Sequence, residues 1–230
     1  MTKRKCIQTV CACVCALISI FSFGACDLPT ALTSYLQSAE EEPSGVAYAL
    51  SEDKTYAKVV GYNGGETTVV IADTYQSVPV TRIDNDAFAL RSIVSVSIPE
   101  TVTTIGFSAF YYCTKLQQIT LPGSLQAIGG SAFEHCDSLT EIVIPDSVIT
   151  VGRRAFARCS WLTSVAFGSG VSYIGAHVFE NSRNLVSVAL ANTNGWVSGE
   201  NAVPADDLSN PATAARYLRI TYSYENWTRS

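Results

Sequence analysis

Residues 105–125 read IGFSAFYYCTKLQQITLPGSL, and the same order of apolar residues, glycine and proline recurs along residues 80–190. The copies are anchored by phenylalanines spaced 22, 23, 23 and 23 residues apart, at Phe88, Phe110, Phe133, Phe156 and Phe179. A fixed period of this size is typical of a solenoid, in which each coil buries its apolar face against its neighbours. The sequence therefore predicts five stacked coils of about 23 residues.

The second half of each copy predicts one short parallel strand per coil. Apolar and polar residues alternate there, so Ile119 and Leu121 are expected to point inward and Thr120 outward. Pro122 has no N–H and a fixed φ, and therefore turns the chain out of the sheet. A glycine such as Gly129 fits a bend that needs either a positive φ or a close approach between coils. The Ala-Phe pair is expected in a helical turn, with Phe filling the space between coils.

The repeated wording Ile-Gly-x-x-Ala-Phe-x-x-Cys-x-x-Leu-x-x-Ile-x-Leu-Pro resembles the BspA-type leucine-rich repeat of bacterial surface proteins. The resemblance covers about half the chain and implies adhesion or host contact for some family members. The outer copies depart from the pattern, since Asp84 replaces the glycine of the first while Val178 and Ser182 replace the alanine and cysteine of the last. Outer coils have only one neighbour and are expected to be atypical. The expected fold is an α/β repeat solenoid with short parallel strands, helical turns and a cap at each end.

Residues 1–25 have the features of a secretory signal peptide, with a basic start and an apolar run over residues 10–23 that is short for a membrane span. The residues before Cys26 resemble a lipobox, which implies lipid attachment to Cys26. The alternative is ordinary cleavage after Ala25 and release. Residues 26–44 are polar and acidic and are expected to form a flexible tether.

The repeats are expected to lie between two caps. Residues 45–80 contain strand-like segments around the turn signal Asn63-Gly64-Gly65, which predicts a β-rich N-terminal cap. Residues 191–230 contain a helix start near Asn210 and several aromatic residues. These aromatics are expected to cover the last coil, with carbohydrate stacking as the alternative role.

The charge balance excludes two classes of partner. The chain carries 15 Lys+Arg and 20 Asp+Glu, and removing Lys3, Arg4 and Lys5 with the leader leaves 15 − 3 = 12 basic residues and a net charge of 12 − 20 = −8. Nucleic-acid binding and electrostatic adhesion to an anionic membrane both need basic patches. We expect neither.

The three cysteines outside the leader, Cys113, Cys136 and Cys159, occupy one slot in consecutive coils. The coil spacing permits one disulfide bond, but three residues cannot pair evenly and Ser182 fills the same slot. Small buried thiols are favoured over a disulfide, and a metal site is disfavoured because a fourth ligand is missing.

The sequence contains little that indicates catalysis. His135 and His177 are the only histidines, and both are expected to be exposed to solvent outside any Ser/His/Asp arrangement. The paired Gly129 and Gly130 belong to the repeat rather than to a nucleotide-binding loop. We therefore expect no enzyme activity, no cofactor and no metal.

The outward side of the strand ladder is the candidate binding face, because solenoids commonly bind through such surfaces. The face comprises the outward strand residues Ser95, Ser97, Gln118, Thr120, Glu141, Val143, Ser164, Ala166, Ser187 and Ala189. A second candidate surface consists of Tyr111, Tyr112, Trp161 and Tyr173 near the turns, although Trp161 has the alternative of packing over its neighbouring coil. The leading hypothesis is a non-catalytic bacterial surface lipoprotein that binds an extracellular protein or glycoprotein. The alternative is a structural or assembly component of the cell envelope.

Overall fold

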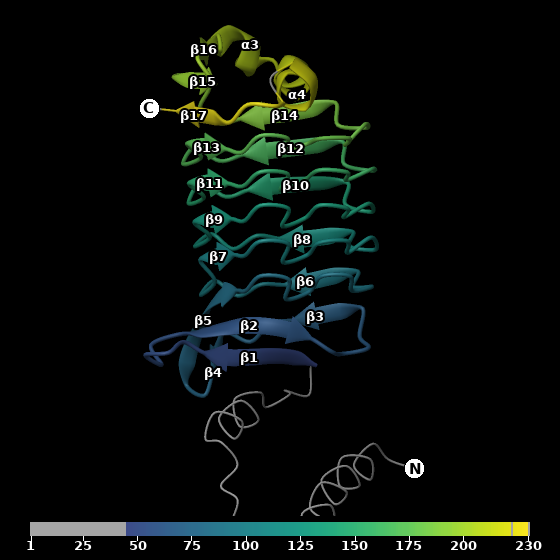
Figure 1. The fold of residues 1–230 in the computed structure, drawn as a ribbon, viewed down its shortest axis with the longest axis vertical. Coiled ribbons are helices and arrows are strands. Elements are labelled where there is room, and N and C mark those ends of the chain that lie inside the picture. The colour runs from purple at the N-terminus through teal and green to yellow at the C-terminus, as the bar shows by residue number, and fades with distance from the viewer. Residues whose placement is uncertain (1–44, 222, 230) are drawn as a thin grey trace, which may run out of the picture. The chain divides into compact units, whose positions relative to one another are not determined.

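The computed structural model describes residues 45–221 and 223–229 of the chain. The expected signal peptide, Cys26 and tether lie outside these residues. From residue 45 onward the chain winds into coils that stack along one axis (Figure 1). Among the described residues, no helix has the length and apolar character needed to cross a membrane.

Each complete coil contributes two short strands, where the sequence indicated one. The first strand of successive coils lies on one face, as β3 (Thr68–Val70), β6 (Ser95–Ser97), β8 (Gln118–Thr120), β10 (Glu141–Ile144), β12 (Ser164–Phe167) and β14 (Ser187–Leu190). The second strand lies on another face, as β5 (Val78–Ile83), β7 (Thr104–Ile105), β9 (Ala127–Ile128), β11 (Thr150–Val151) and β13 (Tyr173–Ile174). The second set was missed because two-residue strands are too short to show an alternating pattern.

Neighbouring coils pair in parallel, with equivalent residues side by side. Glu141 pairs with Ser164, and Ser164 pairs with Ser187, at a constant offset of one repeat. The same offset joins Thr150 to Tyr173 on the other face. Each slot of the repeat therefore forms a column along the solenoid.

The Phe-containing turn is not helical, so this part of the expected fold needs correction. The backbone N–H group of every second residue in this turn donates a hydrogen bond to a carbonyl of the next coil. These bonds join Ser108 N to Gly130 O (2.9 Å), Phe110 N to Ala132 O (2.8 Å) and Tyr112 N to Glu134 O (2.8 Å). Ser108 and Tyr112 have left-handed backbone conformations, with φ values of 52° and 59°. A helix would require these N–H groups to bond four residues back within the same coil. In this turn, hydrogen bonds between coils replace the hydrogen bonds within a helix.

The five repeat phenylalanines form a continuous stack inside the solenoid. All five side chains are fully buried. The distances between successive ring centroids are 5.1, 5.2, 5.3 and 5.9 Å. Tyr62 of the N-terminal segment extends the stack, with its ring centroid 5.7 Å from that of Phe88. Phe therefore fills the space between coils, as the sequence indicated.

The repeat glycines are explained by close approach alone. A Cβ atom on Gly129 would lie 2.5 Å from the carbonyl carbon of Gly106, which no side chain tolerates. None of the repeat glycines among the described residues has a positive φ, which instead occurs two residues later, at Ser108 and Ser131. The positive-φ half of the sequence expectation is wrong.

The first coil rests on two N-terminal strands. Strand β1 (Val46–Leu50) pairs antiparallel with β2 (Ala57–Tyr62), β2 pairs in parallel with β5, and β4 (Thr74–Tyr75) pairs antiparallel with β5. Asp84, which occupies the glycine position of the repeat, forms an ion pair with Lys58 of β2 (Nζ–Oδ2 2.8 Å). Burial raises the pKa of Asp84, but hydrogen bonds from Lys58 and from the Asn85 N–H and the charge of Lys58 outweigh it and hold the pKa below its usual value. The aspartate that replaces the repeat glycine thus links the first coil to β2 through its ion pair with Lys58.

The C-terminal segment covers the other end. Strand β17 (Trp227–Arg229) pairs antiparallel with β13 and with β15 (Trp196–Ser198), which also pairs with β16 (Asn201–Ala202). Helices α3 (Ala205–Ser209) and α4 (Pro211–Arg216) follow, and η1 (Tyr217–Thr221) is a π-helical turn. The Asn210 side chain caps α4 by accepting the N–H groups of Ala212 and Thr213, which agrees with the sequence signal. Trp196 and Trp227 are buried, whereas Tyr224 is exposed.

Replacing Phe133 with Ala is expected to lower the free energy of unfolding by about 3–5 kcal/mol, because it removes a fully buried ring from the centre of the stack. Chemical denaturation measures this change. Phe107→Ala is the matched control, since Phe107 is 56% exposed and its loss should cost no more than about 0.5 kcal/mol. Equal effects of the two substitutions would contradict the stacking model.

Candidate binding surface

The ten residues of the predicted binding face point outward from five successive strands. Register places them in columns, so that Ser95 lies beside Gln118 and Ser97 beside Thr120. In the coils that follow, Val143, Ala166 and Ala189 continue the column that contains Ser97 and Thr120. Gln118, Thr120, Glu141 and Val143 are exposed, whereas Ser164 and Ala166 are half-buried. Ser97 and Ala189 are exposed as well, so both outward residues of a strand are exposed only on β8 and β10.

The strand ladder is interrupted between β8 and β10. Strand β8 ends one three-stranded sheet (β3-β6-β8), and β10 begins another (β10-β12-β14). On the other side of the same two coils, β9 and β11 remain paired, with Ala127 beside Thr150 and Ile128 beside Val151. The two coils therefore lose their strand pairing on one face only.

A groove of about 490 Å³ occupies this interruption. Gln118 and Thr120 line one wall, and Glu141 and Val143 line the other. Val143 is 69% exposed, and together with Ile119, Leu121, Ile142 and Pro145 it gives the groove an apolar component beside the polar Gln118, Thr120 and Glu141. The sequence did not predict the groove, because Gln118 and Glu141 occupy the same slots as residues in coils that pair normally.

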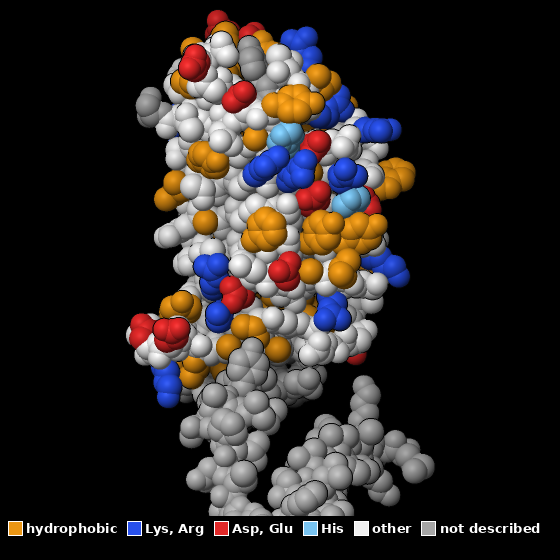
Figure 2. Space-filling view, in the orientation of Figure 1, with side chains coloured by type: hydrophobic (Ala, Val, Ile, Leu, Met, Phe, Trp, Pro, Cys, Tyr) orange, Lys and Arg blue, Asp and Glu red, His pale blue; other side chains and the backbone are white. Residues whose placement is uncertain are grey.

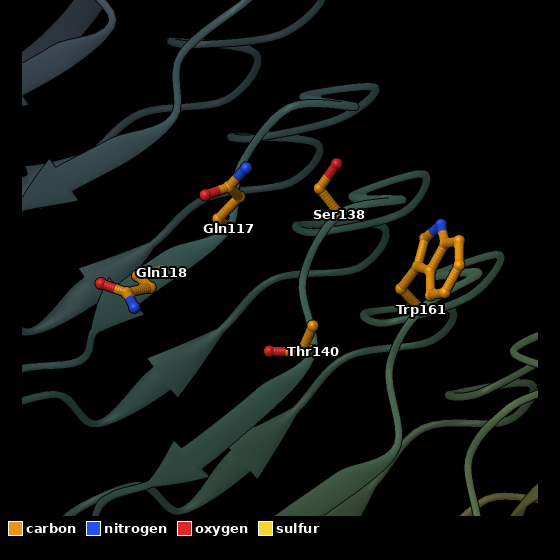
Figure 3. Close-up of a pocket in the computed structure, with 5 residues that line it drawn as sticks. All are labelled: Gln117, Gln118, Ser138, Thr140 and Trp161. Atoms are coloured by element: carbon orange, nitrogen blue, oxygen red, sulfur yellow. The ribbon is translucent and has the colours of Figure 1, made fainter.

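A second hollow of about 320 Å³ continues the groove toward the turns. Figure 3 shows its lining residues, which come from three successive coils: Gln117, Gln118, Ser138, Thr140 and Trp161. Trp161 is 65% exposed, so the alternative in which it packs over its neighbouring coil is wrong. Because Gln118 and Thr140 line both hollows, the strand face and Trp161 form one surface, here called the Trp161 groove.

The other aromatic residues of the predicted second surface separate into two places. Tyr111 and Tyr112 lie beside His135, with ring centroid distances of 6.3 and 4.6 Å from the imidazole. Tyr173 belongs to β13, in the other sheet. The four aromatic residues therefore do not make one surface.

Both histidine side chains are largely covered, so the expectation of solvent exposure is wrong. The His135 side chain is 23% exposed, and its Nδ1 lies 4.0 Å from Asp137 Oδ2. The His177 side chain is 12% exposed, and its ring lies against Tyr224. Ser160 donates its hydroxyl hydrogen directly to Asp137 (2.9 Å) rather than to His135. A base-activated serine requires the histidine between serine and aspartate, and this arrangement lacks it.

The three repeat cysteines are free and buried, and each forms a hydrogen bond. Each Sγ atom donates to the carbonyl of the repeat Phe in the preceding coil: Cys113 to Phe88 O (3.0 Å), Cys136 to Phe110 O (3.4 Å) and Cys159 to Phe133 O (3.1 Å). Ser182 makes the same bond to Phe156 O at 2.8 Å. Sequence reasoning missed this bond, and the serine in the cysteine slot was the signal that indicated it.

Burial raises the pKa of the Cys113 thiol to about 12, and burial also raises the pKa values of Cys136 and Cys159. A nucleophilic cysteine needs the opposite shift, because the thiolate is the reactive form. In the described part of the chain, no group of three or more His, Cys, Asp or Glu side chains is placed to hold a metal ion.

Comparison with known proteins identifies the repeat. The family model for the BspA type leucine rich repeat region matches residues 81–199 in six copies, one more than the number of Phe anchors. A leucine-rich repeat protein of T. pallidum is 35% identical, with a TM-score of 0.62 over 66% of this chain and 72% of that chain. A leucine-rich repeat protein of Bacteroides ovatus is 28% identical, with a TM-score of 0.58 over 63% of this chain and 39% of that chain. The search of curated proteins found no match.

The raised pKa values predict that the three repeat thiols do not react with a thiol reagent at pH 8 in the folded protein, and that three additional thiols react after unfolding. Counting labelled cysteines with and without denaturant measures this. Cys159→Ser should reduce the gain to two with little loss of stability, because Ser182 already makes the equivalent bond. Fast labelling of a repeat cysteine in the folded protein would contradict the prediction.

Proposed function

Because the chain belongs to the BspA-type leucine-rich repeat family, we propose that it is an exported bacterial surface protein that binds a protein or glycoprotein partner without catalysis. The observation that carries the proposal is the interrupted ladder between β8 and β10, which opens the Trp161 groove on the outward strand face. Solenoids commonly bind through such faces.

The Trp161 groove suits an extended segment of a partner. Its two walls are strand edges, and extended peptides bind strand edges through backbone hydrogen bonds while side chains enter neighbouring hollows. Gln118 and Thr140 supply amide and hydroxyl groups along the groove. Trp161 lies at one end as an exposed aromatic anchor, a residue type enriched in the energetically dominant part of interfaces.

The affinity of a single molecule for its partner is expected to be low, and the apparent affinity of many molecules displayed together is expected to be high. The rest of the face consists mainly of serine and alanine, which are under-represented among residues that dominate binding energy. Display of many copies on one surface raises the apparent affinity without any new contact. Lipid attachment at Cys26, after export directed by residues 1–25, would provide that display.

The absence of catalysis is supported by the chemistry of the nucleophile candidates. The buried thiols are held neutral, and the hydroxyl of Ser160 is bonded to a carboxylate rather than to a base. Neither group is activated for attack.

The full chain, purified from the expressing cells and immobilised at high density, is expected to retain an extracellular glycoprotein or matrix protein. Gln118→Arg should weaken this binding at least tenfold, about 1.4 kcal/mol, because the longer charged side chain fills the groove. Binding to a panel of such proteins is measured by surface plasmon resonance.

Gln126→Arg is the matched control, because Gln126 is exposed in the same coil but precedes β9 on the other face. It should leave binding unchanged. Retention of envelope proteins alone, with no extracellular partner, would overturn the proposal in favour of a structural role in the cell envelope.

Cys26→Ala is expected to release the protein from the membrane fraction into the medium, because one lipidated cysteine supplies the anchor. Fractionation with immunoblotting measures the distribution. Ala25→Val should slow processing while leaving the cysteine in place. An unchanged membrane fraction in Cys26→Ala would refute anchoring at this residue.

A further inference from the structure

A third hollow lies on the turn side of Trp161, outside the Trp161 groove. Its volume is about 480 Å³, within the roughly 300–1,000 Å³ of pockets that hold small ligands. It is lined by polar and basic side chains from three coils: His135, Arg158, Ser160, Asn181, Arg183 and Asn184. We call it the Arg183 pocket.

The lining of the Arg183 pocket contains two guanidinium groups and no carboxylate, although the whole chain is acidic. Among the described residues, no ion pair includes the Arg183 guanidinium, and that of Arg158 lies 3.8 Å from Glu134, with half of its side chain exposed. The nearby carboxylate of Asp137 already accepts the Ser160 hydroxyl. Figure 2 shows Lys and Arg side chains beside the two histidines on this face, with Asp and Glu side chains between them. The Arg183 guanidinium therefore has no carboxylate partner among the described residues, whereas an anion in the pocket shares the Arg158 guanidinium with Glu134.

The net charge of −5 does not prevent binding of an anion at this place. At physiological ionic strength, exposed charges are screened beyond about 8 Å, so the groups that line the pocket and the adjacent carboxylates of Glu134 and Asp137 decide the interaction. Guanidinium groups suit carboxylate and sulfate groups because their fork geometry allows two parallel hydrogen bonds.

The polar groups of the pocket are fixed in position before any ligand enters. Asn184 Nδ2 donates to the Ser160 backbone carbonyl at 2.7 Å, which leaves the Asn184 amide oxygen as an acceptor. The Ser160 hydroxyl donates to Asp137, which leaves its oxygen lone pairs free to accept. These acceptors beside the arginine donors match a ligand that carries both hydroxyl groups and an acidic group.

An aromatic surface borders the pocket. Tyr112 is 43% exposed, and its ring lies 4.6 Å from that of His135, which lines the pocket. Such a ring offers an apolar face with a polar edge. A sugar ring presents C–H groups on one face and hydroxyl groups at its edge and therefore matches such a surface, whereas free phosphate has no apolar group.

We propose that the Arg183 pocket binds an anionic saccharide, with its carboxylate or sulfate held by Arg158 and Arg183 and its hydroxyl groups by Ser160 and Asn184. This proposal deepens the proposed function and rests on it, because the sugar would belong to the glycoprotein partner. Ser160 and Trp161 are consecutive residues, so the two sites are adjacent. A glycoprotein therefore reaches both sites with its sugar in the Arg183 pocket and its polypeptide in the Trp161 groove.

The experiment measures binding of the full chain to four immobilised probes at 0.15 M salt. The probes are a uronic-acid oligosaccharide, its carboxyl-reduced neutral form, the neutral form after sulfation, and polyglutamate. We expect binding of the uronate or the sulfated oligosaccharide, and at least tenfold weaker binding of the neutral form and of polyglutamate. Comparing the first and third probes distinguishes carboxylate from sulfate recognition.

Arg183→Gln and Arg158→Gln should each weaken saccharide binding at least tenfold. Arg153→Gln is the matched control for charge, because Arg153 is exposed in the same coil as Arg158 and does not line the pocket. Gln118→Arg should leave saccharide binding unchanged, which separates failure of this proposal from failure of the Trp161 groove. Equal weakening by Arg153→Gln, equal binding of polyglutamate, or no binding of either acidic saccharide would overturn the proposal.

Discussion

The rest of the structure depends on the hydrogen bond from the N–H of a repeat Phe to the carbonyl of the residue that precedes the Phe of the next coil, which is formed by the first four of the five repeat phenylalanines. Phe133 donates to Ala155 O at 2.8 Å, and Phe156 donates to Val178 O at 2.9 Å. These bonds hold the turns at the spacing of a parallel β ladder. The Phe rings then stack at 5.1–5.9 Å, and the cysteine slot reaches a carbonyl of the neighbouring turn.

A stack of coils leaves the first and last coils without a neighbour on one side, and a different set of strands covers each of these two ends. At the first coil, strand β2 pairs with β5 and Lys58 neutralises the aspartate that replaces the repeat glycine. At the last coil, β17 runs antiparallel to β13 and brings Trp227 into the core. Unpaired strand edges invite association with other chains, and these two arrangements pair the outer edges of β5 and β13.

The candidate binding surface forms where the stacking relaxes on one side. Paired β9 and β11 keep the two central coils together, while β8 and β10 separate across the Trp161 groove. The Arg183 pocket is displaced by one coil toward the C-terminus, and the consecutive residues Ser160 and Trp161 line different hollows. A rigid scaffold therefore presents two chemically different sites side by side, one polar with an aromatic anchor and one basic.

The sequence by itself determined the solenoid, its period, the buried Phe column and the outward strand residues, because these follow from residue types repeated at fixed offsets. Only the tertiary structure decided that the Phe turn is a ladder rather than a helix, since the choice depends on hydrogen bonds between residues 22 positions apart. The interruption between β8 and β10 and the Arg183 pocket were equally hidden. Gln118, Arg158 and Arg183 occupy ordinary variable slots, and their combination into surfaces arises only when neighbouring coils are stacked.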